Sequence, residues 1–573
     1  MLLERTFERT LDRLVAAAVP GQAFEAWTFD DRESRAEAER RLAEKGVTAR
    51  IRSAYKPLLH AFLEEIDLAG VTAIGIGYPV RPHTPENRFR LEAYPLAALV
   101  GDREIRFFPS TDESPDYSVM LTGSDGRVRH CRVRAPNRVH VDVAGETNLS
   151  PTGWYASGAD DTGERLETDY EMLFEAAVAA ISEHDWGAAE PFFEELNIRV
   201  ELPCADAVLA HPGETVSLKE ALHEELYFSL LEVFQRKTGR PIGDRGLRPG
   251  QIVPEVVASD GRIVLRIETR ALSGDVEECA FQPLDAAREP LATAQVAAEL
   301  DGLGGGAFQA RSRSGRRVRA CHVTGSDAAV MISAGQHANE TTGVVGALRA
   351  ARRLAARQGA HFTVSPLENP DGYALHQRLR RDNPHHMHHA ARYTAFGDDL
   401  EYRPRDAGDL NETEIRLTAE RLSGARLHVN LHGYPAHEWT RPLSGYVPRA
   451  HEMWTVPKGF FLIMRYHEGW SEPAEALLDK VTRRLGEVPG LLQNNARWID
   501  VFEAHAGDTG LRLVNGIPCL ADVDDRHAVP LTLITEYPDE TIYDAAFVAG
   551  HTAQMETVLA AYDAWQEIAP ACA

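Results

Sequence analysis

The feature that most constrains the fold is a series of apolar runs, in the last half of the chain, that each end in a short polar turn. Residues 328–333 form such a run, and a helix-forming stretch over 341–356 follows it. Strands that alternate with helices in this way favour an α/β sheet with helices on both faces. In such sheets, reactive side chains gather where strands end and loops begin.

Four polar stretches lie at these points: residues 336–340 (QHANE), 369–373 (NPDGY), 430–434 (NLHGY) and 534–537 (ITEY). The first and third contain His337, Glu340 and His432, and two histidines with one carboxylate are a common ligand set for catalytic zinc. Three protein ligands leave a fourth position for water, and Glu536 is the type of group that activates such a water. We therefore predict that Zn²⁺ is the cofactor.

Each of these residues also has an ordinary structural interpretation. An HxxE pair often occurs by chance, and a lone histidine on a strand is more often a buried or surface side chain than a ligand. The order of the four stretches, three of them after or on a predicted strand, favours the zinc site over coincidence.

This pattern resembles the zinc carboxypeptidase family, the M14 metallopeptidases, from about residue 285 to the C-terminus. Residues 314–318 (SGRRV) look like the family's Gly-Arg-x-Ile strand entry, and residues 369–372 are close to its Asn-Pro-Asp-Gly segment. The resemblance implies an α/β/α sandwich around a mixed eight-stranded sheet. By position, the family's zinc ligands and general base match His337, Glu340, His432 and Glu536.

The resemblance also assigns a supporting role to Asp399. Residues 397–401 (GDDLE) look like the family's Gly-x-Asp-x-Asn-Arg segment, in which the Asp hydrogen-bonds the first zinc histidine. Asp399 would then orient His337, because a carboxylate–histidine–zinc relay fixes the tautomer of the ring. Without the match, a turn or helix N-cap role for this Asp is about equally reasonable.

The chain departs from the family where Glu401, Tyr402 and Arg403 replace an Asn-Arg pair that grips a terminal carboxylate. Recognition of a terminal carboxylate therefore stays open. An arginine that polarises the scissile carbonyl is expected between residues 369 and 399, because a guanidinium there stabilises the oxyanion. We predict Arg378 for this role. The other candidates, for this role or for substrate binding, are Arg380, Arg381, Arg392 and Arg403; any one of them alone is more often solvated surface charge.

Residues 385–389 (HHMHH) place four imidazoles close together, and Pro384 before them indicates a loop. We predict that this loop lines the cleft. A second metal site and a solvated loop without a ligand are the alternatives.

Composition narrows the class of protein. The chain has 573 residues, 44% of them hydrophobic, which is enough for more than one domain. A net charge of -25 argues against a nucleic-acid or anionic membrane partner. The six cysteines show no CxxC spacing, and no apolar run approaches the ~20 residues of a membrane span. Because charged residues also begin at Glu4, we expect a cytoplasmic protein.

The predicted organisation is a catalytic domain over residues 285–573 that follows an α+β region over 1–284. Within that region we expect a helical part over 1–70, a β-rich part over 71–155 and a mixed part over 156–284. The sequence of residues 1–284 does not indicate the role of this region. Capping the cleft, selecting the substrate and building a homo-oligomer are the options.

The expected reaction is zinc-dependent hydrolysis of an amide bond, by a metallocarboxypeptidase that acts on peptides or modified peptides. Glu536 would take a proton from the zinc-held water and pass it to the leaving amine. A deacylase of small N-acyl amino acids, resembling succinylglutamate desuccinylase, is the first alternative because it uses the same ligand set on a related fold. A binding protein with a decayed peptidase domain is the second, although all three ligands and Glu536 are present.

Overall fold

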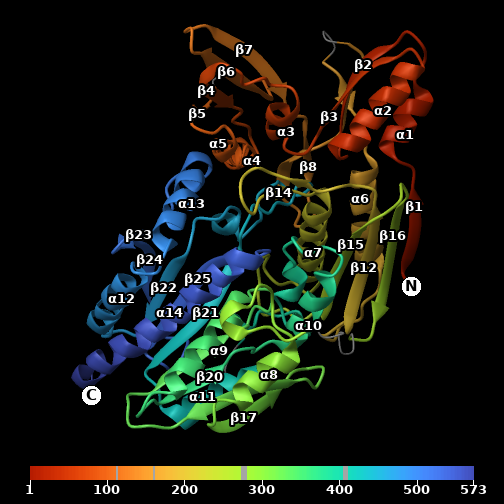
Figure 1. Ribbon diagram of the computed structural model, residues 1–573. Coiled ribbons are helices and arrows are strands. Elements are labelled where there is room, and N and C mark those ends of the chain that lie inside the picture. The colour runs from red at the N-terminus through yellow and green to blue at the C-terminus, as the bar shows by residue number, and fades with distance from the viewer. Residues whose placement is uncertain (111–113, 159–161, 273–279, 404–410, 573) are drawn as a thin grey trace.

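The computed structural model describes residues 1–110, 114–158, 162–272, 280–403 and 411–572. The C-terminal half forms a nine-stranded mixed sheet in the order β17-β18-β20-β19-β21-β25-β22-β24-β23 (Figure 1). Its strands are β17 (Gly306–Arg311), β18 (Arg317–Val323), β19 (Val330–Ala334), β20 (Phe362–Ser365), β21 (Leu427–Pro435), β22 (Phe461–Tyr466), β23 (Arg512–Val514), β24 (Ile517–Val523) and β25 (Leu531–Glu540). The four central strands β20, β19, β21 and β25 are parallel.

Helices cover both faces of this sheet. Val330 and Ile332 of β19 lie in one apolar core with α9 and α14, whereas Met331 packs with Ala419 of α11. Because successive side chains of a strand point to opposite faces, α11 lies opposite α9 and α14. The helices of this half are α8 (Thr293–Asp301), α9 (Thr342–Ala355), α10 (Pro370–Leu379), α11 (Glu414–Ser423), α12 (Ser471–Leu485), α13 (Leu491–His505) and α14 (Asp544–Ile568).

The predicted α/β/α sandwich with a mixed sheet is therefore confirmed for the C-terminal half. The resemblance implied eight strands, and the described residues form nine. Among these residues, no helix combines the length and the apolar character needed to cross a membrane.

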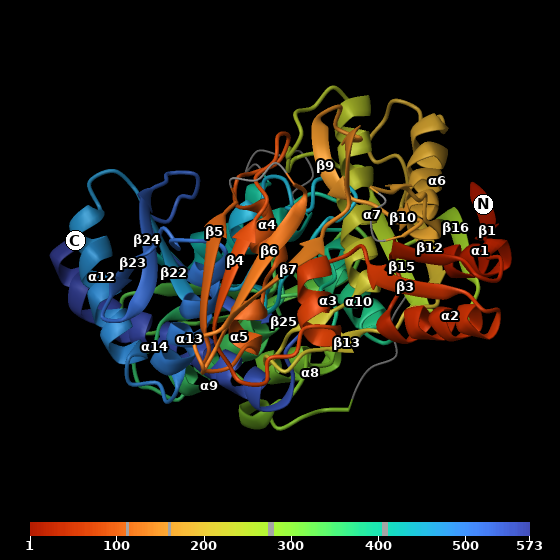
Figure 2. The same cartoon turned by 90° about the horizontal axis from the view of Figure 1, so that it is seen from above.

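The N-terminal half contains three separate four-stranded sheets, which Figure 2 shows from above. Their orders are β1-β16-β12-β15, β11-β10-β2-β3 and β5-β4-β6-β7. The strands are β1 (Leu3–Phe7), β2 (Ala23–Thr28), β3 (Thr48–Ser53), β4 (Val71–Tyr78), β5 (Glu104–Pro109), β6 (Asp116–Gly123), β7 (Val128–Arg134), β10 (Trp154–Ala156), β11 (Glu164–Arg165), β12 (Glu195–Leu202), β15 (Gln251–Ala258) and β16 (Ile263–Arg270). Two short ladders pair β8 (Asn137–Val141) with β9 (Thr147–Pro151), and β13 (Ala207–Val208) with β14 (Thr215–Val216).

The expectation that residues 1–70 are helical is wrong in part, because β1, β2 and β3 interrupt the helices. Gly46 ends α2 with a φ of +76°, a conformation that glycine adopts readily, and β3 then pairs in parallel with β2. This pairing joins segments that are distant in sequence, so the local charge pattern of 48–53 does not reveal it. The helices of this half are α1 (Thr10–Ala17), α2 (Arg32–Glu44), α3 (Pro57–Glu64), α4 (Arg88–Glu92), α5 (Leu96–Leu99), α6 (Asp169–Glu183) and α7 (Leu218–Lys237).

Helix α7 connects the two halves of the molecule. Its Leu222 and Phe228 lie in the same apolar core as Leu375, Tyr393 and Trp439 of the C-terminal half. The helix is buried on nearly all sides although it carries four glutamates, so these carboxylates need partners within the protein. The division of the chain at residue 284 stays a prediction, and one apolar core crosses it.

Candidate metal centre

The candidate metal centre lies where two neighbouring parallel strands end. β19 stops at Ala334, and Gly335 turns the chain with a φ of +64° in a space where a Cβ would meet Leu367. His337 and Glu340 follow on this turn. His432 lies on β21, which pairs with β19, so the polar residues of both strands meet at one edge of the sheet.

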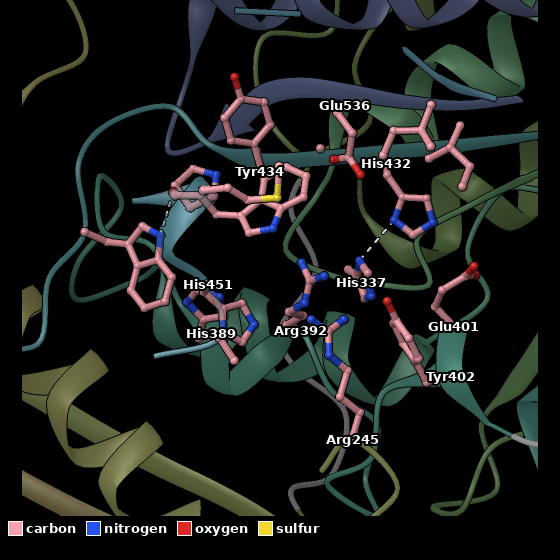
Figure 3. A pocket seen from close by; sticks show the side chains of 18 of the residues that line it. Arg245, His337, His389, Arg392, Glu401, Tyr402, His432, Tyr434, His451 and Glu536 are labelled. Carbon is pink, nitrogen blue, oxygen red and sulfur yellow. Dashed lines mark hydrogen bonds between the residues drawn. The ribbon is translucent and has the colours of Figure 1, made fainter. Parts of the chain in front are cut away.

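The three predicted ligands converge on one point. The Nδ1 atom of His337 lies 2.8 Å from Oε1 of Glu340 and 3.0 Å from Nδ1 of His432. The His432 Nδ1 lies 2.9 Å from the other oxygen of Glu340. All three side chains are buried. Figure 3 shows the two imidazoles facing each other at the cavity wall.

The donor set fits a zinc ion. Asp399 Oδ1 lies 3.1 Å from Nε2 of His337, so this nitrogen donates and Nδ1 is left as a lone pair that faces Glu340 and His432. Tetrahedral zinc with bonds of ~2.0–2.2 Å holds its ligand atoms about 3.3 Å apart, close to the spacing of this triangle. Two imidazoles and a carboxylate are also the ligand chemistry that zinc takes at catalytic sites.

Mutual charge dominates the ionisation of His337 and Glu340, whereas burial lowers the pKa of His432. Burial and the Arg392 cation lower the pKa of His337, but the Glu340 and Asp399 carboxylates outweigh them and leave that pKa raised. Burial raises the pKa of Glu340, and the nearby His337, His432 and Arg392 outweigh it, so the net pKa is lowered. Glu340 is therefore held as the carboxylate, the form that binds a cation.

Glu536 is brought beside the cluster by strand register. In the parallel pair of β21 and β25, Glu536 lies directly opposite His432, and both side chains line the same cavity. Burial and the charge of Glu340 raise the pKa of Glu536 well above its ordinary value. A carboxylate with a raised pKa is a stronger base, which is the property that a general base requires.

The cluster opens into a cavity of about 460 Å³ with two chemically different ends (Figure 3). His389 and His451 line one end, where the ring of Trp439 lies 4.5 Å from that of His389. The other end is polar and is lined by Arg245, Glu401 and Tyr402, and Arg465 donates to Glu401 there. Arg392 also lines the cavity and lies close to the metal ligands, because its Nη1 is 2.7 Å from Oε1 of Glu340.

The structure does not bring Arg378 to this cavity, so its predicted place beside the scissile carbonyl is wrong. It lies at the end of α10, and its Nη atoms donate to Glu195 of β12 at 2.9 and 3.0 Å while its Nε lies 3.0 Å from Glu255 of β15. These acidic partners come from the N-terminal half, and they hold the guanidinium against that half. Arg392, ranked behind Arg378 from the sequence, is the residue that faces the cluster.

The other predicted arginines also lie away from the cluster. Arg381 lines a second cavity that it shares with Arg378. Arg380 donates to Glu289 and Gln377. Arg403 is buried and bound to Asp398 and Glu412, so the expectation that it binds substrate is wrong.

The histidine-rich loop lines the metal cavity with one ring. His389 is that residue, and its Nδ1 lies 2.8 Å from Glu224 of α7. His386 and His388 line the second cavity, where His386 meets Asp206. The ring of His385 packs against Tyr543. The prediction that this loop lines the cleft therefore holds for His389.

Sequence reasoning missed the residues that the N-terminal half brings to the cavity. Arg245 lines it directly, and Glu224 supports it through His389. A charged helix such as α7 is ordinarily solvated. The one signal against that is that its apolar residues are spread over every face and form no single stripe, a pattern that is typical of a buried helix. For Arg245 we find no signal in the sequence.

Comparisons with known proteins agree with the site. Residues 308–403 match the family model described as zinc carboxypeptidase, which confirms the predicted resemblance of the C-terminal half. No curated protein matches the chain. Similar solved structures include a metallo-carboxypeptidase from Burkholderia cenocepacia, with 14% identity over 54% of this chain and 76% of that one and a TM-score of 0.29.

Two further solved structures are similar to part of the chain. Bovine thrombin-activatable fibrinolysis inhibitor has 9% identity over 48% of this chain and 95% of its own, with a TM-score of 0.29. An aspartoacylase family protein from Mesorhizobium loti has 14% identity over 44% and 67%, with a TM-score of 0.23. Because these TM-scores are low, the functional assignment depends on the family match and on the geometry of the site.

Proposed function

With a zinc metallopeptidase domain of the carboxypeptidase type in the C-terminal half as the premise, we propose that this protein hydrolyses an amide bond of a peptide or modified peptide. One observation carries the proposal. The Nδ1 atoms of His337 and His432 lie 3.0 Å apart, and each lies 2.8–2.9 Å from one oxygen of Glu340, at a cavity wall that also holds Glu536. This arrangement places three metal ligands and a candidate general base at the wall of a cavity that is large enough for a substrate.

Each residue has a role that follows from its position. His337, Glu340 and His432 would hold the zinc ion, which would supply a Lewis acid for the substrate carbonyl and for water when bound. Glu536 takes the proton of the attacking water, and then gives it to the leaving amine. Asp399 holds the ring of His337 in the tautomer that turns Nδ1 toward the other ligands.

Arg392 is suited to stabilise the negative charge that develops on the carbonyl oxygen. Its Nη1 binds Glu340, and its buried Nε has no hydrogen-bond partner within the described residues. An unsatisfied buried donor costs free energy, and a developing oxyanion would satisfy it in the transition state. This assignment replaces Arg378.

The proposal is tested with Glu536→Gln, which removes the base but keeps the size of the side chain. Glu540→Gln is a matched control, because Glu540 lies buried on the same strand, binds Asn339 and does not line the cavity. Both variants should bind one equivalent of zinc. We expect Glu536→Gln to lose about 10²–10⁴-fold or more in kcat on an N-acyl dipeptide, whereas Glu540→Gln retains most of it. Zinc-loaded Glu536→Gln with wild-type turnover would remove Glu536 from this role.

A further inference from the structure

Three arginines line the metal cavity, and they differ in what holds their guanidinium groups. Arg392 donates to Glu340 at 2.7 Å, and Arg465 donates to Glu401 at 2.8 Å and lies 3.5 Å from Asp524. Arg245 makes no side-chain hydrogen bond within the part of the chain that the structure describes. Its nearest acidic atom is Oδ2 of Asp399, 3.5 Å from its Nη1.

The position of Arg245 is nevertheless fixed by the protein. Its carbonyl oxygen accepts a hydrogen bond from the amide of Asp399 at 3.2 Å. Further along the same loop, Arg248 binds Asp398 at 3.0 Å and the Gly250 amide binds the Phe396 carbonyl at 2.8 Å. This loop follows α7 in the N-terminal half, so three hydrogen bonds attach it to the segment that carries the metal-supporting Asp399.

The side chain of Arg245 is also held in a fixed orientation. The guanidinium carbon of Arg245 lies 4.4 Å from the centre of the Tyr402 ring, a stacking distance that fixes its plane. The side chain is 28% exposed, and Figure 3 shows it pointing into the cavity beside Arg392. An ordered guanidinium with unused donors is a ready bidentate site for a carboxylate.

We propose that Arg245, supplied by the N-terminal half, binds a carboxylate of the substrate next to the bond that is cut. Asp399 lies 3.5 Å from this guanidinium and 3.1 Å from the ring of His337, so a bound carboxylate would lie close to the metal centre. The carboxylate has two chemical sources: the α-carboxylate of the leaving amino acid, or a carboxylate within the acyl group. The proposal rests on the proposed amide hydrolysis, and it gives the N-terminal half a part in substrate selection.

The test compares wild type with Arg245→Ala and Arg245→Lys on two matched substrate pairs. The first pair is N-acetyl-Phe-Phe and its C-terminal amide, and the second is N-succinyl- and N-acetyl-phenylalaninamide. Arg240→Ala is the control, because Arg240 lies in the same loop, binds Glu190 and does not line the cavity. Zinc content and thermal unfolding are measured for every variant.

We expect wild type to prefer the acid in one pair, and Arg245→Ala to raise KM for that acid by about 10- to 100-fold while the uncharged partner changes little. Arg245→Lys should recover part of the preference, and Arg240→Ala should keep all of it. The pair that responds identifies the source of the carboxylate. If Arg245→Ala raises KM equally for all substrates, Arg245 only positions Asp399. If Arg245→Ala keeps the wild-type preference for the acid, Arg245 does not touch the substrate. Either result overturns the proposal.

A binding measurement separates this inference from the proposed hydrolysis. Calorimetry with 3-phenylpropanoate and 3-phenylpropanamide compares a carboxylate with its neutral amide and requires no turnover. In the zinc-loaded protein, Arg245→Ala should weaken binding of the acid by about 10-fold or more and leave that of the amide unchanged. If wild type hydrolyses neither substrate pair, the proposed hydrolysis fails while this result still decides the role of Arg245. An acid-to-amide ratio that is equal in both proteins would contradict the inference.

Discussion

Two buried groups of histidines and carboxylates in the described part of the chain are built differently. At the sheet edge, His337, Glu340 and His432 turn three ligand atoms toward one point. Along α7, two histidines of the C-terminal half each contact a different carboxyl group of the helix: His437 lies 2.6 Å from Glu220, and His389 lies 2.8 Å from Glu224. Both groups are buried, so burial does not distinguish them.

The difference is whether the partners satisfy one another. In the α7 group, each of these two histidines hydrogen-bonds one carboxyl group, and that bond replaces the water that both groups lose on burial. At the sheet edge, the Nδ1 atoms of two imidazoles face each other as well as a carboxylate, and a cation is the group that satisfies all three. We therefore interpret the α7 group as a structural contact between the two halves and the sheet-edge group as a metal site. The following experiments test this distinction.

The largest expected effect is on zinc binding. His432→Ala removes a ligand, so zinc affinity should fall by more than the about 100-fold that the loss of a supporting residue costs. His437→Ala removes a histidine of equal burial from the α7 group and should keep one equivalent of zinc. Competition with a chromogenic chelator measures both. A His437→Ala protein that loses zinc while His432→Ala retains it would reverse our assignment of the two groups.

The next effect concerns the two arginines that the sequence did not rank correctly. Arg392→Ala should lower kcat by about 10²–10³-fold, because it removes a donor that faces the reacting carbonyl. Arg378→Ala should leave kcat nearly unchanged and lower stability, since this arginine binds Glu195 and Glu255. Steady-state kinetics with urea unfolding distinguishes these outcomes. A large loss of kcat in Arg378→Ala with intact zinc would restore the original prediction.

The α7 group should make stability depend on pH. Burial lowers the pKa of His437, but the Glu220 carboxylate outweighs it and raises this pKa from 6.5 to about 9. A raised pKa contributes stability that is complete below pH 6.5 and is lost as the pH rises through about 9. Between pH 6 and 9.5, the free energy of unfolding of wild type should therefore fall by on the order of 3 kcal/mol more than that of His437→Gln. Urea unfolding at both pH values tests this, and equal losses in the two proteins would refute it.

The smallest effect is expected at the residue that supports the metal ligand. Asp399→Asn weakens the hydrogen bond that orients His337 and should lower zinc affinity by about 10–100-fold. Asp398→Asn is the neighbouring control; Asp398 binds Arg403 and Thr394, so its loss should affect stability rather than zinc. Equal zinc affinities in the two variants would show that Asp399 has no orienting role.

The convergence of the three candidate ligands was predictable because its signal is local. Each ligand follows or lies on an apolar strand of the sequence, and the spacing of His337 and Glu340 lets both reach one ion from a single turn. The sheet of the C-terminal half was predictable for a related reason, since its central strands are continuous apolar runs.

The remaining features depend on contacts between distant parts of the chain. The choice between Arg378 and Arg392 is decided by Glu195, which is 183 residues from Arg378. The carboxylates of α7 find their histidines 165 and 217 residues away, so a helix that looks solvated becomes buried. Strand β3 likewise forms because β2 lies beside it, and not because of its own alternation of charged residues.

The most direct test of the metal site is a crystal structure of the zinc-loaded protein, with anomalous scattering recorded above and below the zinc absorption edge. We predict one strong peak bonded to Nδ1 of His337, to Nδ1 of His432 and to the Glu340 carboxylate. No peak at these atoms, or a peak between His437 and Glu220 instead, would contradict the assignment.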